Sequence, residues 1–304
     1  MKVINPTTIT PAMLTSSTAA VPSGTDPAVW AVGTAYNVGD KAYLASTNRI
    51  YQCLVANTGA SPDVNLTGTT PKWLDWSAVN RWKMFDAEVN TQTLVATPLT
   101  VVFQPGSINA LALLELSGTQ ASVSVKNAPG GSVVYSATKS LDGSAITDWY
   151  SYFTDPFVMI DSWVMTDIPA YSTCEVTVSI TAASGNVYCG VMQCGLWYDL
   201  GGTQMGAQVG IIDYSTKKID AYNRTVLAVG NYSRRLNTTL MMDASVFYKT
   251  HKLLVSLRAK PCIWIGTDYD TYSPMVVFGY YKDFAIDVRY PTSVYCSLQV
   301  EGLT

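Results

Sequence analysis

Short runs in which apolar and hydroxyl-bearing side chains alternate are the feature that most constrains how this chain folds. In "EVTVSIT", Val176, Val178 and Ile180 alternate with Thr and Ser, which is the two-residue period of a half-buried strand. Further strand candidates between residues 87 and 200, separated by the turn sequences "APGG", "LDGS" and "ASGN", are "LTVVFQP", "INALALLEL", "ASVSVK", "SVVYSA" and "NVYCGVMQC". This recurrence predicts two packed antiparallel sheets, a β-sandwich, over residues 81–200.

The pattern changes in the last third of the chain. The segment "DASVFYKTHKLLVSLRAKP" predicts a helix, with Asp243 at the N-cap position, apolar Val246, Leu253 and Leu257 near one face, and a proline at its end. Strand candidates surround the helix: "KKIDAYNRTVLAVG", "CIWIGT", "MVVFGYY", "FAIDVRY" and "VYCSLQVEG". One helix on a largely antiparallel sheet predicts an α+β assembly domain over residues 201–304.

The first part of the chain has two different patterns. Residues 1–26 are rich in Thr, Ser, Ala and Pro without periodicity, which predicts an extended arm or linker, loose in a monomer or laid on a neighbour in an assembly. Residues 27–80 hold two strand candidates, 41–44 and 50–55, around the turn "ASTNR", which predicts a small β-domain built on a hairpin. The segment "NRWKMFD" marks the junction with the next domain.

The composition narrows the classes of partner. Charged residues make up 13% of the chain, against about 25% in an average soluble domain. Together with 19 tyrosines, this favours a surface committed to assembly, with a stable β-rich monomer as the alternative. A net charge of −3, with no basic cluster beyond Arg234 and Arg235, argues against nucleic acid. No apolar run predicts a membrane span or a signal peptide.

The cysteines do not predict a disulfide framework. Cys189 and Cys194 are five positions apart, which puts them on opposite faces of one strand and prevents a bridge between them. No pair has the CxxC spacing typical of zinc or redox sites. We expect free, buried thiols in a protein made in a reducing cytosol, at positions 53, 174, 189, 194, 262 and 296.

Residues suited to catalysis or metal binding are scarce. His251 is the single histidine and lies in the predicted helix, so a multi-histidine metal site is excluded by count. Asp268 and Asp270 lack the Gly and closing Glu of a calcium loop, and an Asx-rich turn is the expected structure there. We expect no enzyme, cofactor or metal; the glutamates available for a glycosidase carboxylate pair are Glu88, Glu115, Glu175 and Glu301.

The segment from Trp30 to Trp76 resembles the small chitin- and cellulose-binding modules found at the ends of chitinases. The shared pattern is a Trp, then Tyr36, then Gly-Asp, a second strand ending in Tyr51, and a terminal Trp. The resemblance implies a compact three-stranded β-fold whose surface aromatic residues stack on sugar rings, since pyranose C–H groups present an apolar face to an aromatic ring. It covers about one sixth of the chain.

One departure from that family concerns the sugar-stacking residues. After Tyr51 the family usually carries an exposed Trp or Trp-Tyr pair, whereas this chain has Leu54 and Val55. Trp30, Tyr36 and Tyr51 fit the core of that family's fold equally well. Stacking on sugar would then fall to Trp73, Trp76 or Tyr43, and a purely structural role for the aromatic residues stays open. The candidate sugar-contacting residues are Trp73, Trp76 and Tyr43, followed by Trp30, Tyr36 and Tyr51.

The whole chain is similar to virion proteins of the tail or baseplate region of tailed bacteriophages. The similarity is carried by "MKVINPTTITPAML", "NRWKMFD" and "YKDFAIDVRYPTSVYCSLQVEGL". It implies a structural subunit of a phage tail, baseplate or collar, assembled in the host cytoplasm, with other virion proteins and copies of itself as partners. The module would face outward for weak, multivalent contact with host surface polysaccharide. The alternatives are a free carbohydrate-binding accessory protein and, ranked last, a polysaccharide depolymerase.

Overall fold

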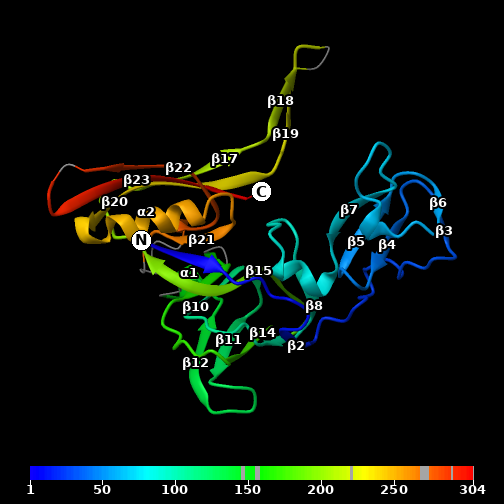
Figure 1. The fold of residues 1–304 in the computed structure, drawn as a ribbon, viewed down its shortest axis with the longest axis horizontal. Coiled ribbons are helices and arrows are strands. Elements are labelled where there is room, and N and C mark those ends of the chain that lie inside the picture. The colour runs from blue at the N-terminus through cyan, green and yellow to red at the C-terminus, as the bar shows by residue number, and fades with distance from the viewer. Residues whose placement is uncertain (145–147, 155–157, 220–221, 268–273, 289, 304) are drawn as a thin grey trace.

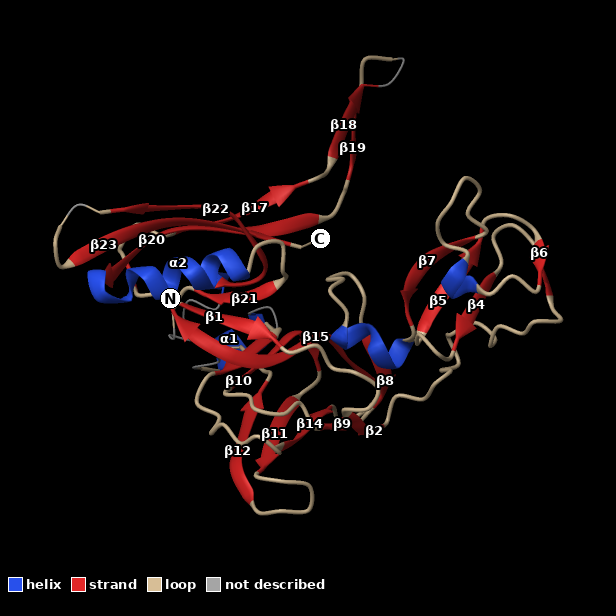
Figure 2. Cartoon of the chain, in the orientation of Figure 1, coloured by secondary structure: helices blue, strands red, loops and turns tan. Residues whose placement is uncertain are grey.

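A computed structural model of the protein describes residues 1–304 except 145–147, 155–157, 220–221, 268–273, 289 and 304. The chain is mainly β, and every pairing between its named strands is antiparallel (Figures 1 and 2). Among the described residues, two large sheets contain eleven and five strands, and the smaller sheets contain three, two and two. The prediction of a mainly β chain is confirmed.

The predicted β-sandwich is present in the middle of the chain. Val123, Val176 and Val178 from the five-stranded sheet pack in one core with Leu113 and Cys189 from the eleven-stranded sheet. The five-stranded sheet has the order β12 (Val133–Ser140), β11 (Gln120–Lys126), β14 (Glu175–Thr181), β9 (Leu99–Phe103) and β2 (Leu14–Ser17). Facing it are β13 (Ser162–Met165), β10 (Ala110–Ser117), β15 (Asn186–Asp199) and β8 (Thr93–Ala96).

The N-terminal strand β1 (Lys2–Pro6) joins the sandwich to the C-terminal part of the chain. Val3 is paired with Tyr198 of β15 on one side and with Trp264 of β21 (Cys262–Ile265) on the other. The expectation of a free extended arm over residues 1–26 is therefore corrected, because β1 is an interior strand and β2 pairs with β9. Val3 and Ile4 are buried on opposite faces of the sheet, so the strand has no polar face and no alternation.

The C-terminal part lays one helix on the antiparallel sheet, as predicted. The strands are β16 (Gly202–Thr203), β17 (Gln208–Asp213), β20 (Tyr232–Asp243), β22 (Val276–Asp287) and β23 (Ser293–Gly302). A 3-10 turn, η3 (Ala244–Val246), leads from Asp243 into α2 (Phe247–Ser256). Leu254 and Leu257 are buried against the sheet and Leu253 is partly buried, whereas Val246, expected on the same face, is exposed.

The N-terminal module contains the predicted hairpin and third strand. Its sheet is β4 (Lys41–Leu44), β5 (Arg49–Cys53) and β7 (Trp73–Ala78). The module also has β3 (Ala35–Tyr36), β6 (Asn57–Thr58) and the 3-10 turn η1 (Pro62–Val64). The junction "NRWKMFD" forms η2 (Asn80–Phe85), in which Met84 is buried in the sandwich core. The module is thus tied to the sandwich through η2.

A short helix, α1 (Trp149–Thr154), follows β12 and precedes β13 along the chain. One element differs from the expectation drawn from the sequence. The segment "KKIDAYNRTVLAVG" was expected as a strand of the sheet, and it contains two strands, β18 (Thr216–Ile219) and β19 (Thr225–Ala228), paired with each other. This two-stranded ribbon projects away from the sheet that carries it (Figure 1). We call residues 215–228 the arm.

Candidate functional site

The structure places most of the candidate sugar-contacting residues in the interior of the module. Tyr36, Tyr51 and Trp73 are buried in one small core, with Trp30 partly buried against it. The Trp73 ring makes a T-shaped contact with Tyr36, with 5.1 Å between ring centroids, and its Nε1 donates a hydrogen bond of 2.9 Å to the Ala60 carbonyl. These contacts hold the module's fold together, because buried aromatic residues supply much of a small core.

Tyr43 is also buried, on the other face of the same sheet. It packs with Ile50, Val79, Val21 and Trp82, so residues outside the three strands cover it. Burial raises the pKa of its phenol, with the Arg81 charge opposing that shift. The expectation that Tyr43 and Trp73 would stack on a sugar at the surface is therefore corrected, since neither ring face is accessible.

Trp76 is the exposed member of the six candidates. Its side chain is 49% exposed, and the Lys41 ammonium lies 3.6 Å from the centroid of its ring. Lys41 is paired through Gln52 with Leu74, so these three positions share one face of the sheet. Leu74 is exposed too. This small surface, the Trp76 face, combines the apolar side chain of Leu74, the aromatic ring of Trp76 and the Lys41 ammonium, which covers part of that ring.

A cleft of 540 Å³ lies between the sandwich and the base of the arm. The described residues lining it include Glu115, Asp161 and Arg234, together with apolar Leu114, Phe278 and Val229. Arg234 is paired with Asp161 across a distance of 3.3 Å between Nη2 and Oδ2. Within the part of the chain described, the Glu115 carboxylate has no hydrogen bond or ion pair. Burial raises the pKa of Glu115, partly offset by the charge of Arg234. We call this the Glu115 cleft.

Glu115 has an unusual backbone conformation for a residue inside a strand. Its φ is +53°, in the left-handed region that few non-glycine residues adopt. A Cβ at Gly190 on the neighbouring strand would lie 2.5 Å from the Glu115 Oε2 atom, so the carboxylate side chain occupies the space that glycine leaves free. The isolated Gly inside "NVYCGVMQC" was the available sequence signal, because a strand glycine marks a close approach.

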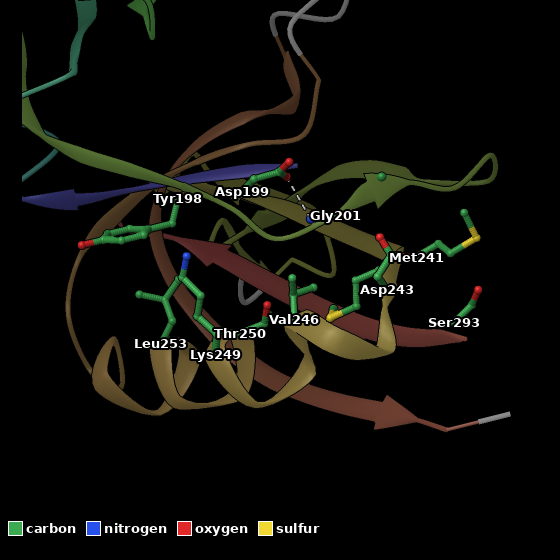
Figure 3. Close-up of a pocket in the computed structure, with 12 residues that line it drawn as sticks. Tyr198, Asp199, Gly201, Met241, Asp243, Val246, Lys249, Thr250, Leu253 and Ser293 are labelled. Carbon is green, nitrogen blue, oxygen red and sulfur yellow. Dashed lines mark hydrogen bonds between the residues drawn. The ribbon is translucent and has the colours of Figure 1, made fainter. Parts of the chain in front are cut away.

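A second cavity, of 410 Å³, lies between the end of β15 and α2 (Figure 3). Lys249, Thr250 and Leu253 reach it from the helix, and Asp199 lies at its opposite side, where its Oδ1 accepts a hydrogen bond of 2.9 Å from the Gly201 N–H. Its described lining contains neither histidine nor cysteine.

The residues singled out for catalysis or metal binding form no metal-ligand group among those that the structure describes. His251 is exposed on α2, with its ring centroid 5.8 Å from that of Phe284. Among the described residues, no three His, Cys, Asp or Glu side chains are grouped as metal ligands. Asp268 and Asp270 lie outside the described residues. The six cysteines are free and buried, which confirms that prediction. Burial raises the pKa of the Cys194 thiol to about 12.

Among its described residues, the arm carries several apolar side chains that are more exposed than buried. Ile219, Tyr222 and Leu227 are 66%, 79% and 70% exposed, and Val229 at the base is 94% exposed. Lys217 is opposite Leu227 and Lys218 is opposite Val226 in the register of the ribbon. Because side chains alternate along a strand, Lys217, Ile219 and Leu227 share one face, and Lys218 and Val226 share the other. Both faces are therefore apolar and basic.

The base of the arm is held by specific backbone contacts. The Tyr214 N–H donates to the Asn231 carbonyl at 3.0 Å, and the Gly230 N–H donates to Ser215 Oγ at 3.0 Å. A Cβ at Gly230 would lie 2.6 Å from the Tyr214 carbonyl oxygen, so glycine permits the two strands to come this close. The arm thus leaves the sheet in a defined direction.

In the part of the chain that the structure describes, no helix is both long and apolar enough to cross a membrane. Three surfaces of the described residues are accessible to a partner: the Trp76 face of the module, the Glu115 cleft and the arm. No protein-family model matches the chain, and no curated protein matches its sequence.

Proposed function

We propose that this protein is a structural subunit of a phage virion, in the tail, baseplate or collar, and that the arm is its main assembly contact. The observation that carries the proposal is the arm, a ribbon with exposed apolar side chains on both faces. A two-stranded ribbon is marginally stable alone, and large exposed apolar patches mark sites of association. Burial of the arm against another subunit supplies the missing cover.

A second exposed apolar surface supports an assembly role. Trp149, Tyr150 and Phe153 of α1 are each more exposed than buried, and the Trp149 and Phe153 rings are stacked with centroids 6.4 Å apart. With charged residues at 13% of the chain, little ionic surface separates one copy from the next. A subunit with several apolar surfaces can contact more than one neighbour in a symmetric assembly.

The assignment to a phage tail, baseplate or collar rests on the similarity described from the sequence. In such a particle the module would be displayed outward, with other virion proteins and copies of this chain as neighbours. Trp76 and Lys41 are then the residues available for contact with host surface polysaccharide. One exposed ring gives a weak site, and the copy number of the particle would supply avidity. The role of the chain is binding and assembly rather than catalysis.

The exposed Trp76 ring is the one observation that favours the alternative of a free carbohydrate-binding accessory protein. That alternative predicts a protein that stays monomeric at all concentrations and is retained by chitin or cell-wall polysaccharide. The burial of Trp73 and Tyr43 weakens it, because stacking platforms in a free binding module must be accessible.

Sedimentation velocity over a range of protein concentrations tests the assembly role. We expect the wild-type chain to form oligomers of defined size, and Ile219→Ser with Leu227→Ser on one face of the arm to shift it toward the monomer. Val64→Ser is the matched control, because Val64 is 74% exposed but lies in the module. A wild-type chain that remains monomeric throughout, or oligomers that survive the arm substitutions, would contradict the proposal.

A further inference from the structure

We propose that the arm of one copy docks in the Glu115 cleft of a second copy, with Lys217 facing the Glu115 carboxylate. This inference rests on the proposed assembly role of the arm and names its receptor. The arm face that carries Lys217 also carries Ile219 and Leu227, so it offers one cation beside two exposed apolar side chains. The cleft offers a carboxylate beside apolar Leu114 and Phe278.

The charge distribution of the chain favours a second copy as the occupant. Residues 215–228 contain Lys217, Lys218 and Arg224 against Asp220, a net charge of +2. Since the whole chain has a net charge of −3, the remainder carries −5. A basic arm on an acidic body is complementary to the body of another copy of the same chain. Such complementarity steers association and fixes its register.

The Glu115 carboxylate makes no ion pair with any described residue, although the charge of the nearby Arg234 partly opposes the rise of its pKa. Asp161 already has Arg234 at 3.3 Å, so the guanidinium in the cleft is engaged with another acid. Burial disfavours the charged form of Glu115 and raises its pKa. A lysine ammonium brought in by a partner would stabilise the charged form. The Lys217 ammonium of a partner's arm would therefore give the half-buried Glu115 carboxylate the ion pair that it does not make with the described residues of its own chain.

The position of Glu115 is fixed by the backbone. Its positive φ and the glycine at position 190 direct the side chain over the neighbouring strand, where a larger residue would collide with it. The volume of 540 Å³ is within the range of about 300–1,000 Å³ typical of binding pockets. The cleft is therefore large enough to receive side chains from a partner.

The location of the cleft makes a reciprocal contact feasible. Val229 and Tyr232, at the base of the arm, line the cleft beside Glu115. Each copy thus carries its own arm next to the site that would receive the arm of its partner. Two copies related by a twofold axis can exchange arms, so that both contacts are identical.

Charge reversal tests the pairing directly in the full-length chain. We expect Glu115→Lys and Lys217→Glu each to weaken self-association at least about tenfold in sedimentation velocity, and the two together to restore it toward the wild-type value. Glu115→Gln removes the charge with little change of shape and should weaken association less than the reversal. Lys218→Glu is the matched control, because Lys218 lies on the opposite face of the arm. Circular dichroism establishes that each variant is folded.

The outcomes separate this inference from the proposed function. If Leu227→Ser abolishes association while Glu115→Lys leaves it unchanged, or the double variant shows no restoration, the arm docks elsewhere and the inference is overturned with the assembly role intact. If Lys218→Glu weakens association as much as Lys217→Glu, the face assignment is wrong. If the wild-type chain does not self-associate at any concentration, both the inference and the proposed function fail.

Discussion

Separate replacement of Trp73 and Trp76 by Ala distinguishes a structural from a binding role for the module's aromatic residues. The two tryptophans are three positions apart on one strand, but Trp73 is fully buried and Trp76 is 49% exposed. Truncating a buried Trp to Ala destabilises a protein by ~3–5 kcal/mol, and here the Ala60 carbonyl also loses its donor. At Trp76 the loss includes a cation–π contact of ~0.5–1 kcal/mol at an exposed site.

Hydrogen–deuterium exchange of β5 and β7 measures the local stability of the module. We expect Trp73→Ala to accelerate exchange of these strands by roughly 10²-fold to a few thousand-fold, since each 1.4 kcal/mol is a factor of ten. Trp76→Ala should accelerate it by less than about tenfold. Retention on immobilised polysaccharide should fall only for Trp76→Ala among variants that stay folded. Unchanged exchange in Trp73→Ala, with loss of binding, would refute this division of roles.

Three further predictions concern the arm, an acidic residue and the thiols. Gly230→Ala should displace the base of the arm and reduce oligomer formation in sedimentation velocity, because its Cβ would meet the Tyr214 carbonyl. Burial raises the pKa of Asp86 to about 6, so the folded state binds this proton more tightly than the unfolded chain and stability falls as pH rises from about 4 to 6. Urea unfolding should show Asp86→Asn gaining stability relative to wild type over that window, and a constant difference would contradict it. The buried cysteines should react with a thiol reagent only after unfolding; rapid reaction of Cys194 in the native protein would contradict its burial.

The sandwich was predictable because local pattern and tertiary structure agree there. The alternation of Val176, Val178 and Ile180 corresponds to three buried side chains on one face of β14. The N-terminal strand was not predictable, because Val3 and Ile4 are buried on opposite faces and five residues show no period. Only the pairing with β15 and β21, far along the chain, makes this segment a strand.

Which aromatic side chains of the module are exposed could not be predicted from the sequence either. Ala42 and Tyr43 are adjacent and both buried, because the small sheet has a core on each face. Val21 and Trp82 form the second core from outside the three strands, so the burial of Tyr43 depends on how the module meets the rest of the chain. The sequence pattern within the module predicts its strands, but it does not show that Val21 and Trp82 cover Tyr43.

The arm and the Glu115 cleft were also not predictable from local sequence patterns. The strand pattern of "KKIDAYNRTVLAVG" was present, but nothing local shows that the two strands leave the sheet. Glu115 comes into position through a positive φ and through Gly190, which follows it by 75 positions. The cleft also needs Arg234 and Val229 from the C-terminal part. Residues this far apart in the sequence are brought together only by the completed sheet.

The most direct test of the central claim, that the arm is an assembly contact, is electron cryomicroscopy of the oligomer formed by the full-length chain or of a particle that contains it. Ile219 and Leu227 are exposed in the single chain. We predict that both are covered by a neighbouring subunit in the assembly, with Lys217 near its Glu115. Arms that extend into solvent from every subunit would contradict the account.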